Sequence, residues 1–328
     1  MKIMTINTLS RSMEFTLFEM DDNSVIAKGI IERIGLEDSS CEIKYNGEKI
    51  VLTSEINNYE DAVKILFDNL LTLNIISSLD DVKAIGHRVV HGGSKYSNSV
   101  FISDKVINDV YELSDLAPLY NKSEAEGMKA FKSLLPNTLM VAVFDTAFHQ
   151  TISEENFLYP VPYEWYEQYG VRKYGFYGTS HKYVTEEIRK ILGRDNFKLI
   201  SCHLGNGGSV SAIKDMKVVD TSTGFTPLSG IVMGTRSGDI DPSIIPFVME
   251  KEGKNAGEII DDLNHKSGLL GMSQISSDAR DIEREALLGD PQAILTQEKY
   301  AKTVVSYISN YYVELEGADV IIFTAGIG

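Results

Sequence analysis

The stretch Lys198–Ile213, KLISCHLGNGGSVSAI, decides how the rest of the chain is interpreted. An apolar run leads into a Gly-rich turn, and a second run follows in which apolar residues alternate with small polar ones. This pattern predicts two paired strands joined by a tight turn.

The predicted turn, Gly205–Gly208, contains three glycines and one asparagine, residues that tolerate positive φ and leave backbone N–H groups uncovered. Such N–H groups can converge on an anion such as a phosphate. An ordinary Gly-rich hairpin explains the segment equally well. A P-loop is disfavoured, because no Gly-Lys-Ser/Thr follows and the next element is predicted as a strand.

Length and composition restrict the function classes. A chain of 328 residues predicts about two domains, and 43% hydrophobic with 24% charged residues is typical of a globular protein. The net charge of −16 argues against nucleic acid or an anionic membrane as the main partner. Cys41 and Cys202 lie far apart, which suits a reducing compartment. Without a signal peptide or an apolar run of about 18 residues, we predict a cytoplasmic protein.

The element pattern divides the chain into residues 1–149 and 150–328. Residues 2–18 repeat the strand–turn–strand layout of 198–213, and each copy opens one half. Two such units facing each other would form a two-sided phosphate clamp in an interdomain cleft, although the first turn contains no glycine. The chain ends in a Gly-rich loop directly after the predicted strand 320–323, which we interpret as a truncated end.

Two charged residues follow predicted buried strands. Arg88 stands between apolar runs ahead of Gly92 and Gly93, and Asp145 ends the apolar run 139–144. The alternative explanation for Arg88 is a surface ion pair, and the alternative for Asp145 is a turn or a helix cap. Open α/β sheets bind ligands at the carboxyl ends of their strands, which favours a functional role for both residues.

Six motifs in order along the chain resemble the acetate kinase family. They are GHRVVHGG at 86–93, FDTAFH at 144–149, GTSH at 178–181, HLGNG at 203–207, GTRSGDIDP at 234–242 and FTAGIG at 323–328. The resemblance implies an α/β, two-domain duplicated ribonuclease H-like fold, as in sugar kinases and actin, with ATP and Mg²⁺ as cofactors and a homodimer as the assembly. It places the substrate and Mg²⁺ in the first domain and the nucleotide in the second.

The resemblance also implies residue roles. Asn7 would help to hold Mg²⁺, Arg88 and Val90 would bind the substrate carboxylate, Asp145 would be the active-site acid, and Arg236 would stabilise the transferring phosphoryl group. The ATP-binding residues would be His203, Leu204, Gly205, Asn206, Gly207, Asp278, Ala279, Arg280, Gly326, Ile327 and Gly328.

These roles agree with the chemistry of a carboxylate acceptor. Acetate is already ionised at pH 7, so its attack on the γ-phosphate needs no proton abstraction. The obstacle is the approach of two anions, and catalysis is then mostly positioning and cations. The guanidinium groups of Arg88 and Arg236 suit this task because they stay charged and offer a planar fork.

The chain departs from the family at positions of chemical importance. The turn after Asn7 would be rich in Gly and Ser and end in Lys, whereas this chain has Leu9, Arg11 and Glu14. Two active-site histidines fall at Tyr120 and Tyr177, which we keep as catalytic candidates. A tyrosine donates one hydrogen bond but carries no positive charge, and losing one transition-state donor typically costs about 10²–10³ in rate.

Two functions from different classes therefore stand. The first is an acetate kinase that converts ATP and acetate to ADP and acetyl phosphate by direct in-line transfer. The second is a catalytically impaired homologue with a nucleotide-binding or regulatory role. A sugar kinase is a weaker third reading, because Arg88 suits a carboxylate better than a polyol.

Overall fold

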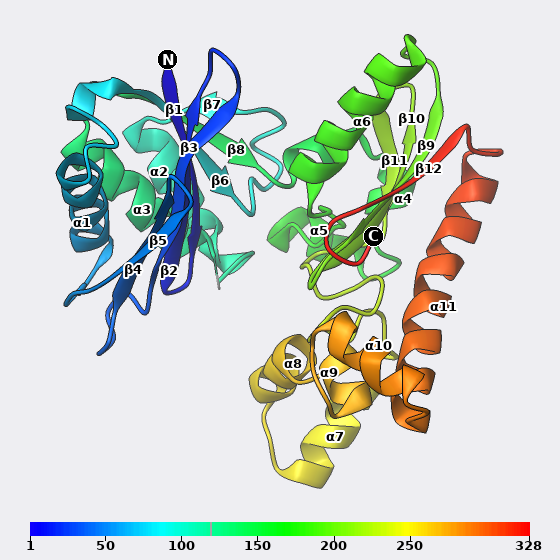
Figure 1. Ribbon diagram of the computed structural model, residues 1–328. Helices are drawn as coiled ribbons and strands as arrows, with labels where there is room; N and C mark the ends of the chain where they lie inside the picture. The colour runs from blue at the N-terminus through cyan, green and yellow to red at the C-terminus, as the bar shows by residue number, and fades with distance from the viewer. Residues whose placement is uncertain (119) are drawn as a thin grey trace. The chain divides into compact units, whose positions relative to one another are not determined.

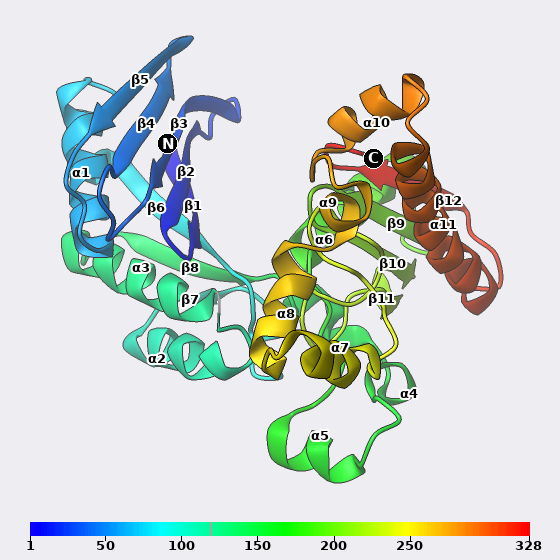
Figure 2. The ribbon, with the colours of Figure 1, turned by 90° about the horizontal axis from the view of Figure 1, so that it is seen from below.

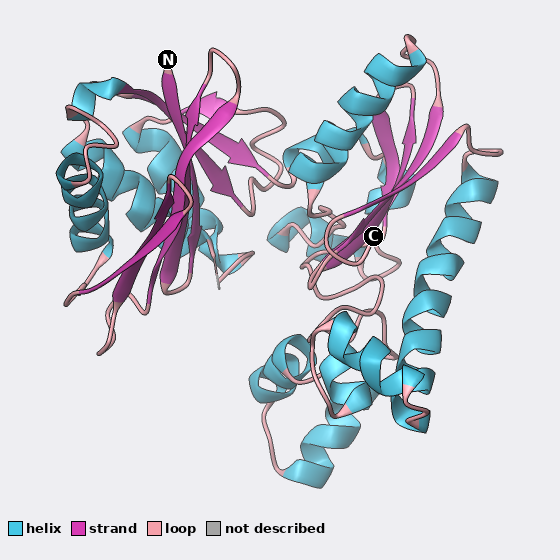
Figure 3. Cartoon of the chain, viewed as in Figure 1, coloured by secondary structure: helices cyan, strands magenta, loops and turns pink. Residues whose placement is uncertain are grey.

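A computed structural model describes residues 1–118 and 120–328. The chain forms two compact units, Met1–Ala147 and Phe148–Gly328. Each unit contains one sheet with helices packed on it (Figures 1 and 3). Among the described residues, no helix has both the length and the apolar character that crossing a bilayer requires.

The first unit is built on an eight-stranded sheet with the order β5-β4-β3-β2-β1-β6-β8-β7. β1 lies at its centre, antiparallel to β2 and parallel to β6, and β6 is parallel to β8. The parallel strands therefore end at one edge of the sheet. The strands are β1 (Lys2–Leu9), β2 (Ser12–Glu19), β3 (Ser24–Glu32), β4 (Ser40–Tyr45), β5 (Glu48–Thr53), β6 (Val82–Val89), β7 (Val100–Phe101) and β8 (Leu139–Phe144).

Three helices of the first unit pack on its sheet: α1 (Tyr59–Thr72), α2 (Asp104–Glu112) and α3 (Asn121–Leu134). Phe67 of α1 and Phe131 of α3 meet edge to face in the main core. Figure 2 shows α1 and α3 lying against the sheet of this unit. A second core joins α2 and α3 to the ends of β6 and β8 through Val89, Val110 and Phe144. These apolar contacts fix the start of α3 against the strand ends that carry the candidate residues.

The second unit repeats the order of four neighbouring strands of the first sheet. Its sheet has the order β11-β10-β9-β12, with β9 antiparallel to β10 and parallel to β12. This order matches β3-β2-β1-β6, so the predicted repeat of 2–18 at 198–213 is confirmed. The strands are β9 (Lys198–Leu204), β10 (Gly208–Lys214), β11 (Lys217–Thr221) and β12 (Val320–Thr324).

Two helices cover the two faces of the second sheet, α6 (Gly178–Leu192) and α11 (Pro291–Glu314). Successive side chains of a strand point to opposite faces. Leu199 of β9 accordingly packs with Val184 of α6, whereas Ile200 packs with Tyr311 of α11. The remaining helices are the short α4 (Glu154–Phe157) and α5 (Tyr163–Tyr169), together with α7 (Ile244–Glu252), α8 (Ala256–His265), α9 (Gly268–Ser273) and α10 (Ala279–Leu287).

Candidate active site

Arg88 is held in place by two polar partners at the carboxyl end of β6. Its Nε and Nη2 donate to Asp145 Oδ2 at 3.0 and 2.6 Å, and its Nη1 donates to Asn7 Oδ1 at 2.8 Å. The register of the sheet brings these groups together, because Asn7 of β1 lies opposite Arg88 and Asp145 directly follows β8. Asp145 is buried, with 3% of its side chain exposed, whereas Arg88 keeps 33% exposed. A buried carboxylate thus orients a cation that remains accessible to a ligand.

Asn7 is the predicted Mg²⁺ ligand, and its amide links two charged side chains. The Oδ1 atom accepts from Arg88, while Nδ2 donates to Glu14 Oε2 at 3.0 Å across the β1–β2 ladder. No group of three or more His, Cys, Asp or Glu side chains in residues 1–118 and 120–328 is arranged to hold a metal. Mg²⁺ in phosphoryl-transfer sites is bound mainly by substrate phosphates and water, with few protein oxygens. A single amide oxygen fits that mode of binding.

The start of α3 holds the backbone that follows Arg88. Asn121 accepts from His91 N–H at 3.2 Å and donates to the His91 carbonyl at 2.9 Å. Both carboxyl oxygens of Glu124 lie 3.1 Å from the Val90 nitrogen, so Val90 N–H donates to this side chain. Tyr120, a predicted catalytic residue, is the N-cap residue of α3, next to Asn121. The structure therefore brings Val90 and Tyr120 to the same edge of the sheet as Arg88.

Glu124 is a buried carboxyl group close to two charges. Only 1% of the residue is exposed. Burial raises the pKa of Glu124 to about 8, opposed by the Val90 hydrogen bond and by Arg88 and reinforced by Asp145. A carboxyl group in this environment carries its proton through much of the neutral range. Glu124 was not among the predicted site residues, because nothing in the local sequence pattern marks its burial.

The predicted phosphate loop joins β9 to β10. Gly205 N–H donates to the Gly207 carbonyl at 3.0 Å, and Gly234 N–H donates to the Asn206 carbonyl at 2.7 Å. None of Gly205, Gly207 and Gly208 has positive φ, so this turn does not use the left-handed backbone that glycine allows. A glycine is needed at position 207 because the space that a side chain would take is occupied by Tyr177. A Cβ there would overlap the Tyr177 hydroxyl and lie 2.9 Å from its ring carbon and 3.3 Å from Arg236 Nη1.

Tyr177 connects Arg236 to this loop. Its backbone is left-handed, with φ 61°, at the N-cap of α6. Its ring stacks on His203 with centroids 5.0 Å apart, and its hydroxyl accepts from Arg236 Nη1 at 3.1 Å. Ser180 Oγ lies 2.8 Å from His203 Nδ1, and this hydrogen bond fixes the plane of the imidazole. Tyr177, Arg236 and two residues of the HLGNG motif, His203 and Gly207, therefore form one contiguous group.

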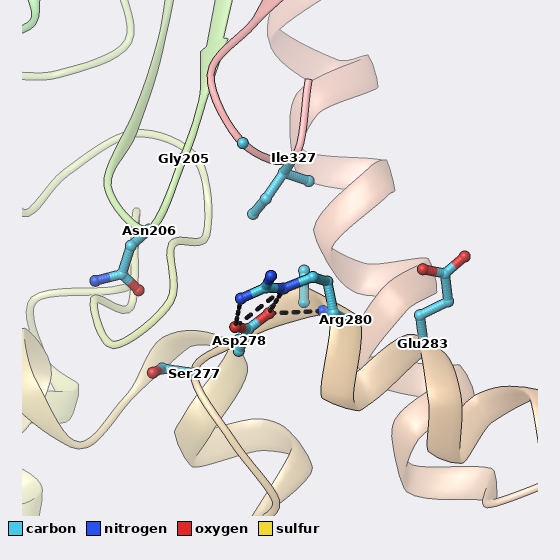
Figure 4. A pocket seen from close by; sticks show the side chains of 9 residues that line it. Gly205, Asn206, Ser277, Asp278, Arg280, Glu283 and Ile327 are labelled. Carbon is cyan, nitrogen blue, oxygen red and sulfur yellow. Dashed lines mark hydrogen bonds and ion pairs between the residues drawn. The ribbon is translucent and has the colours of Figure 1, made fainter. Parts of the chain in front are cut away.

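A cavity of about 580 Å³ lies beside the phosphate loop (Figure 4). Three segments far apart in the sequence line it, comprising Gly205, Asn206, Ser277, Asp278, Ala279, Arg280, Glu283, Gly326 and Ile327. Ligand pockets typically measure about 300–1,000 Å³. Seven of these residues were predicted to bind the nucleotide, whereas Ser277 and Glu283 were not. The remaining nucleotide predictions, His203, Leu204, Gly207 and Gly328, do not line this cavity.

Two of the residues that line the cavity, Arg280 and Asp278, form an ion pair. Arg280 donates to Asp278 through Nε at 3.0 Å and through Nη2 at 2.5 Å, and Asp278 also caps α10 by accepting from Arg280 N–H. These bonds lower the pKa of Asp278 to about 2. Asn206 and Ile327 come from the segments across the cavity (Figure 4). The C-terminal segment is tied to β9, because Ile327 N–H donates to the Leu204 carbonyl at 2.8 Å.

Comparison with known proteins places the chain among carboxylate kinases. The model of the Acetokinase family matches residues 2–328. The chain belongs to this family. It is 54% identical over 329 residues to acetate kinase of Anoxybacillus flavithermus and 52% identical to that of Bacillus subtilis, covering 100% of this chain and 83% of either relative.

Solved structures of this family confirm the predicted fold class. Porphyromonas gingivalis acetate kinase superimposes with a TM-score of 0.95 at 42% identity, covering 99% of this chain and 83% of that one. A propionate kinase from Francisella tularensis superimposes with a TM-score of 0.94 at 39% identity, covering 100% of this chain and 84% of that one. These relatives are described as kinases, and nothing in the comparisons supports the catalytically impaired alternative.

Proposed function

We propose that this acetokinase-family chain is an ATP-dependent acetate kinase. It transfers the γ-phosphoryl group of ATP directly to a carboxylate oxygen of acetate, giving ADP and acetyl phosphate. The observation that carries the proposal is the anchored Arg88, whose guanidinium is oriented by buried Asp145 and by Asn7 while a third of its side chain stays exposed. A fixed planar cation of this kind suits a small carboxylate.

In the first unit, Arg88 and the Val90 backbone segment hold the substrate carboxylate. Because Asp145 is already engaged with Arg88, its role is to orient this arginine and the groups around the substrate. No general base is required, because the attacking oxygen of acetate is already ionised. Residues 1–149 accordingly form the substrate and metal side.

In the second unit, residues 150–328 bind the nucleotide. The cavity lined by Asp278, Arg280 and Ile327 accommodates the nucleoside, and the turn Gly205–Gly207 lies beside it for the phosphates. Arg236 is poised next to Gly207 by the Tyr177 hydroxyl and neutralises charge on the transferring phosphoryl group. Such preorganised donors are usually the largest contribution to catalysis of this kind.

Asn7 would supply one oxygen to a Mg²⁺ ion bound together with ATP, and that ion would supply positive charge beside the phosphates. Glu14, hydrogen bonded to Asn7, adds a negative charge near that position. With Tyr120 and Tyr177 in place of cationic groups, we expect transfer to be slower than a histidine-bearing site would support. We further propose a homodimer in the cytoplasm, on the strength of family membership.

The experiment is a hydroxamate assay for acyl phosphate with Mg-ATP and acetate, propionate or butyrate. We expect ATP-dependent acyl hydroxamate with acetate, and the acyl-chain profile will measure the size of the carboxylate pocket. ATP consumption that yields no hydroxamate with any of the three acids would overturn the proposal. Light scattering of the same preparation tests the dimer.

A further inference from the structure

Glu124 is a buried acidic group that the reaction described above does not use. It lies in the first turn of α3 with both carboxyl oxygens 3.1 Å from the Val90 nitrogen. Val90 follows Arg88 by two residues, and Asn121 binds the next residue, His91, from the same helix end. Glu124 and Asn121 thus accept hydrogen bonds from the backbone N–H groups of Val90 and His91, as a neighbouring strand would.

The environment of Glu124 compensates its negative charge poorly. Within the described residues, Val90 N–H is the only hydrogen-bond donor to its two oxygens. Arg88 is the nearby cation, but it is already paired with Asp145 through two hydrogen bonds. With a neutral Glu124 the charges of Arg88 and Asp145 cancel, whereas an ionised Glu124 leaves this group with one net negative charge.

We propose that Glu124 is a positioning residue for the carboxylate substrate, holding the Val90 backbone and setting by its protonation the net charge that the substrate meets beside Arg88. The inference rests on the proposed function, since it assigns the substrate carboxylate to Arg88. Ionisation of Glu124 repels the incoming anion, and a bound carboxylate in turn favours the protonated form of Glu124.

The other titratable groups on the packed elements do not reproduce this behaviour. Burial lowers the pKa of His87 to about 3 and that of His91 to about 4, so both stay neutral above pH 6. Burial raises the pKa of Tyr59 on α1 above its ordinary value of 10. Arg88 keeps its charge throughout. The remaining acidic groups include Asp145, paired with Arg88, Glu14, which contacts Asn7 on the exposed side, and Asp109 of α2, which accepts hydrogen bonds from Tyr96 and Lys105.

The change of charge predicts a specific kinetic pattern. The KM for acetate rises between pH 6.5 and 9.5, the interval that spans the Glu124 pKa of about 8. We expect a rise of about two- to about fifteenfold, the effect of a unit charge about 10 Å away at effective dielectric constants of about 80 and about 20. The KM for Mg-ATP should not follow this profile, because the nucleotide cavity is formed by the second unit.

The test compares the wild type with three variants. Glu124→Gln keeps an oxygen acceptor for Val90 N–H but cannot ionise, so its KM for acetate should stay flat near the wild-type value at pH 6.5. Glu124→Ala loses the acceptor as well and should have a raised but pH-independent KM. Glu126→Gln is the matched control, because Glu126 lies on the same helix turn but is exposed, and it should keep the wild-type profile.

Saturation-transfer NMR with acetate at both pH values measures carboxylate binding without turnover. A dissociation constant that rises with pH in the wild type but not in Glu124→Gln supports the inference, even if no acetyl phosphate forms and the proposed function fails. A Glu124→Gln variant that keeps the wild-type pH dependence overturns the inference while leaving the kinase proposal intact. Acetate that binds at neither pH overturns both.

Discussion

Replacing Gly207 by alanine is expected to slow phosphoryl transfer by displacing Tyr177 from Arg236. The new Cβ would overlap the Tyr177 hydroxyl and lie 2.9 Å from its ring carbon. Tyr177 cannot retreat freely, because its ring stacks on His203 and its left-handed backbone begins α6. The bond between the hydroxyl and Arg236 Nη1, now 3.1 Å, would therefore break.

The size of the effect follows from the lost bond. Hydrogen bonds to charged groups contribute about 1.5–3 kcal/mol, which corresponds to about 10- to 150-fold in rate if the orientation of Arg236 matters only in the transition state. We expect kcat to fall by that factor while the KM for acetate stays constant, because Arg88 belongs to the other unit. Steady-state kinetics in the hydroxamate assay measures both parameters.

A double-mutant cycle separates this mechanism from general damage. Tyr177→Phe removes the hydroxyl alone and should lower kcat by about tenfold, near the low end of that range. In the double variant the worst overlap is gone, so adding Gly207→Ala to Tyr177→Phe should cost less than about threefold further. Gly86→Ala is the control, because a Cβ at Gly86 meets nothing within 4 Å. Strictly multiplicative losses in the double variant, or full activity in Gly207→Ala, would refute the reasoning.

Three further predictions concern Arg88, the two tyrosines and Glu124. A lysine in Arg88→Lys cannot reproduce the planar guanidinium fork that binds Asp145 and Asn7. Initial-rate kinetics should therefore show a KM for acetate that is higher by about tenfold or more, with the KM for ATP unchanged. A KM for acetate equal to that of the wild type would show that Arg88 does not belong to the carboxylate site. The double variant Tyr177→His/Tyr120→His should have a higher kcat, because a protonated imidazole adds positive charge near the transferring phosphoryl group. An unchanged kcat would show that another element limits the rate, such as the glycine-free turn after Asn7. Burial raises the pKa of Glu124 from its ordinary value of 4.5 to about 8, so between these pH values Glu124 is protonated in the folded state but ionised in the unfolded state. The free energy of unfolding should therefore fall as the pH rises from about 4.5 to about 8. Urea titrations should show a smaller fall in Glu124→Gln, because glutamine cannot ionise.

The regular elements could be predicted from the sequence because their local patterns are strong. Alternating apolar and polar residues marked the β1–β2 pair, and a Gly-rich turn between apolar runs marked the β9–β10 pair. The short helices α4, α5 and α9 and the two-residue strand β7 were not predicted. Helices of four to seven residues and a two-residue strand contain too little periodicity to be recognised, and they are ordered by tertiary packing.

The site was predictable where function sits in local sequence motifs and unpredictable where it depends on packing. The segments containing Asn206, Asp278 and Ile327 were predicted separately, and the cavity brings them together. Glu124 escaped prediction because an acidic residue in the first turn of a helix is ordinarily a solvated one that favours the helix dipole. Its burial arises only when α3 packs on β6.

The turn glycines show the same limit. Their conformational freedom suggested positive φ, whereas the structure uses Gly207 for the space that a Tyr177 side chain 30 residues earlier occupies. A contact between two loops distant in sequence leaves no trace in either loop alone.

We expect the phosphoryl group of ATP to pass directly to a carboxylate. ³¹P NMR of the protein with Mg-ATP and acetate can follow this transfer, because every phosphorus product is observed at once. ADP and acetyl phosphate should appear in equal amounts, at a rate that depends on the acetate concentration. ADP accompanied only by inorganic phosphate, at a rate that does not depend on acetate, would show that no such transfer takes place.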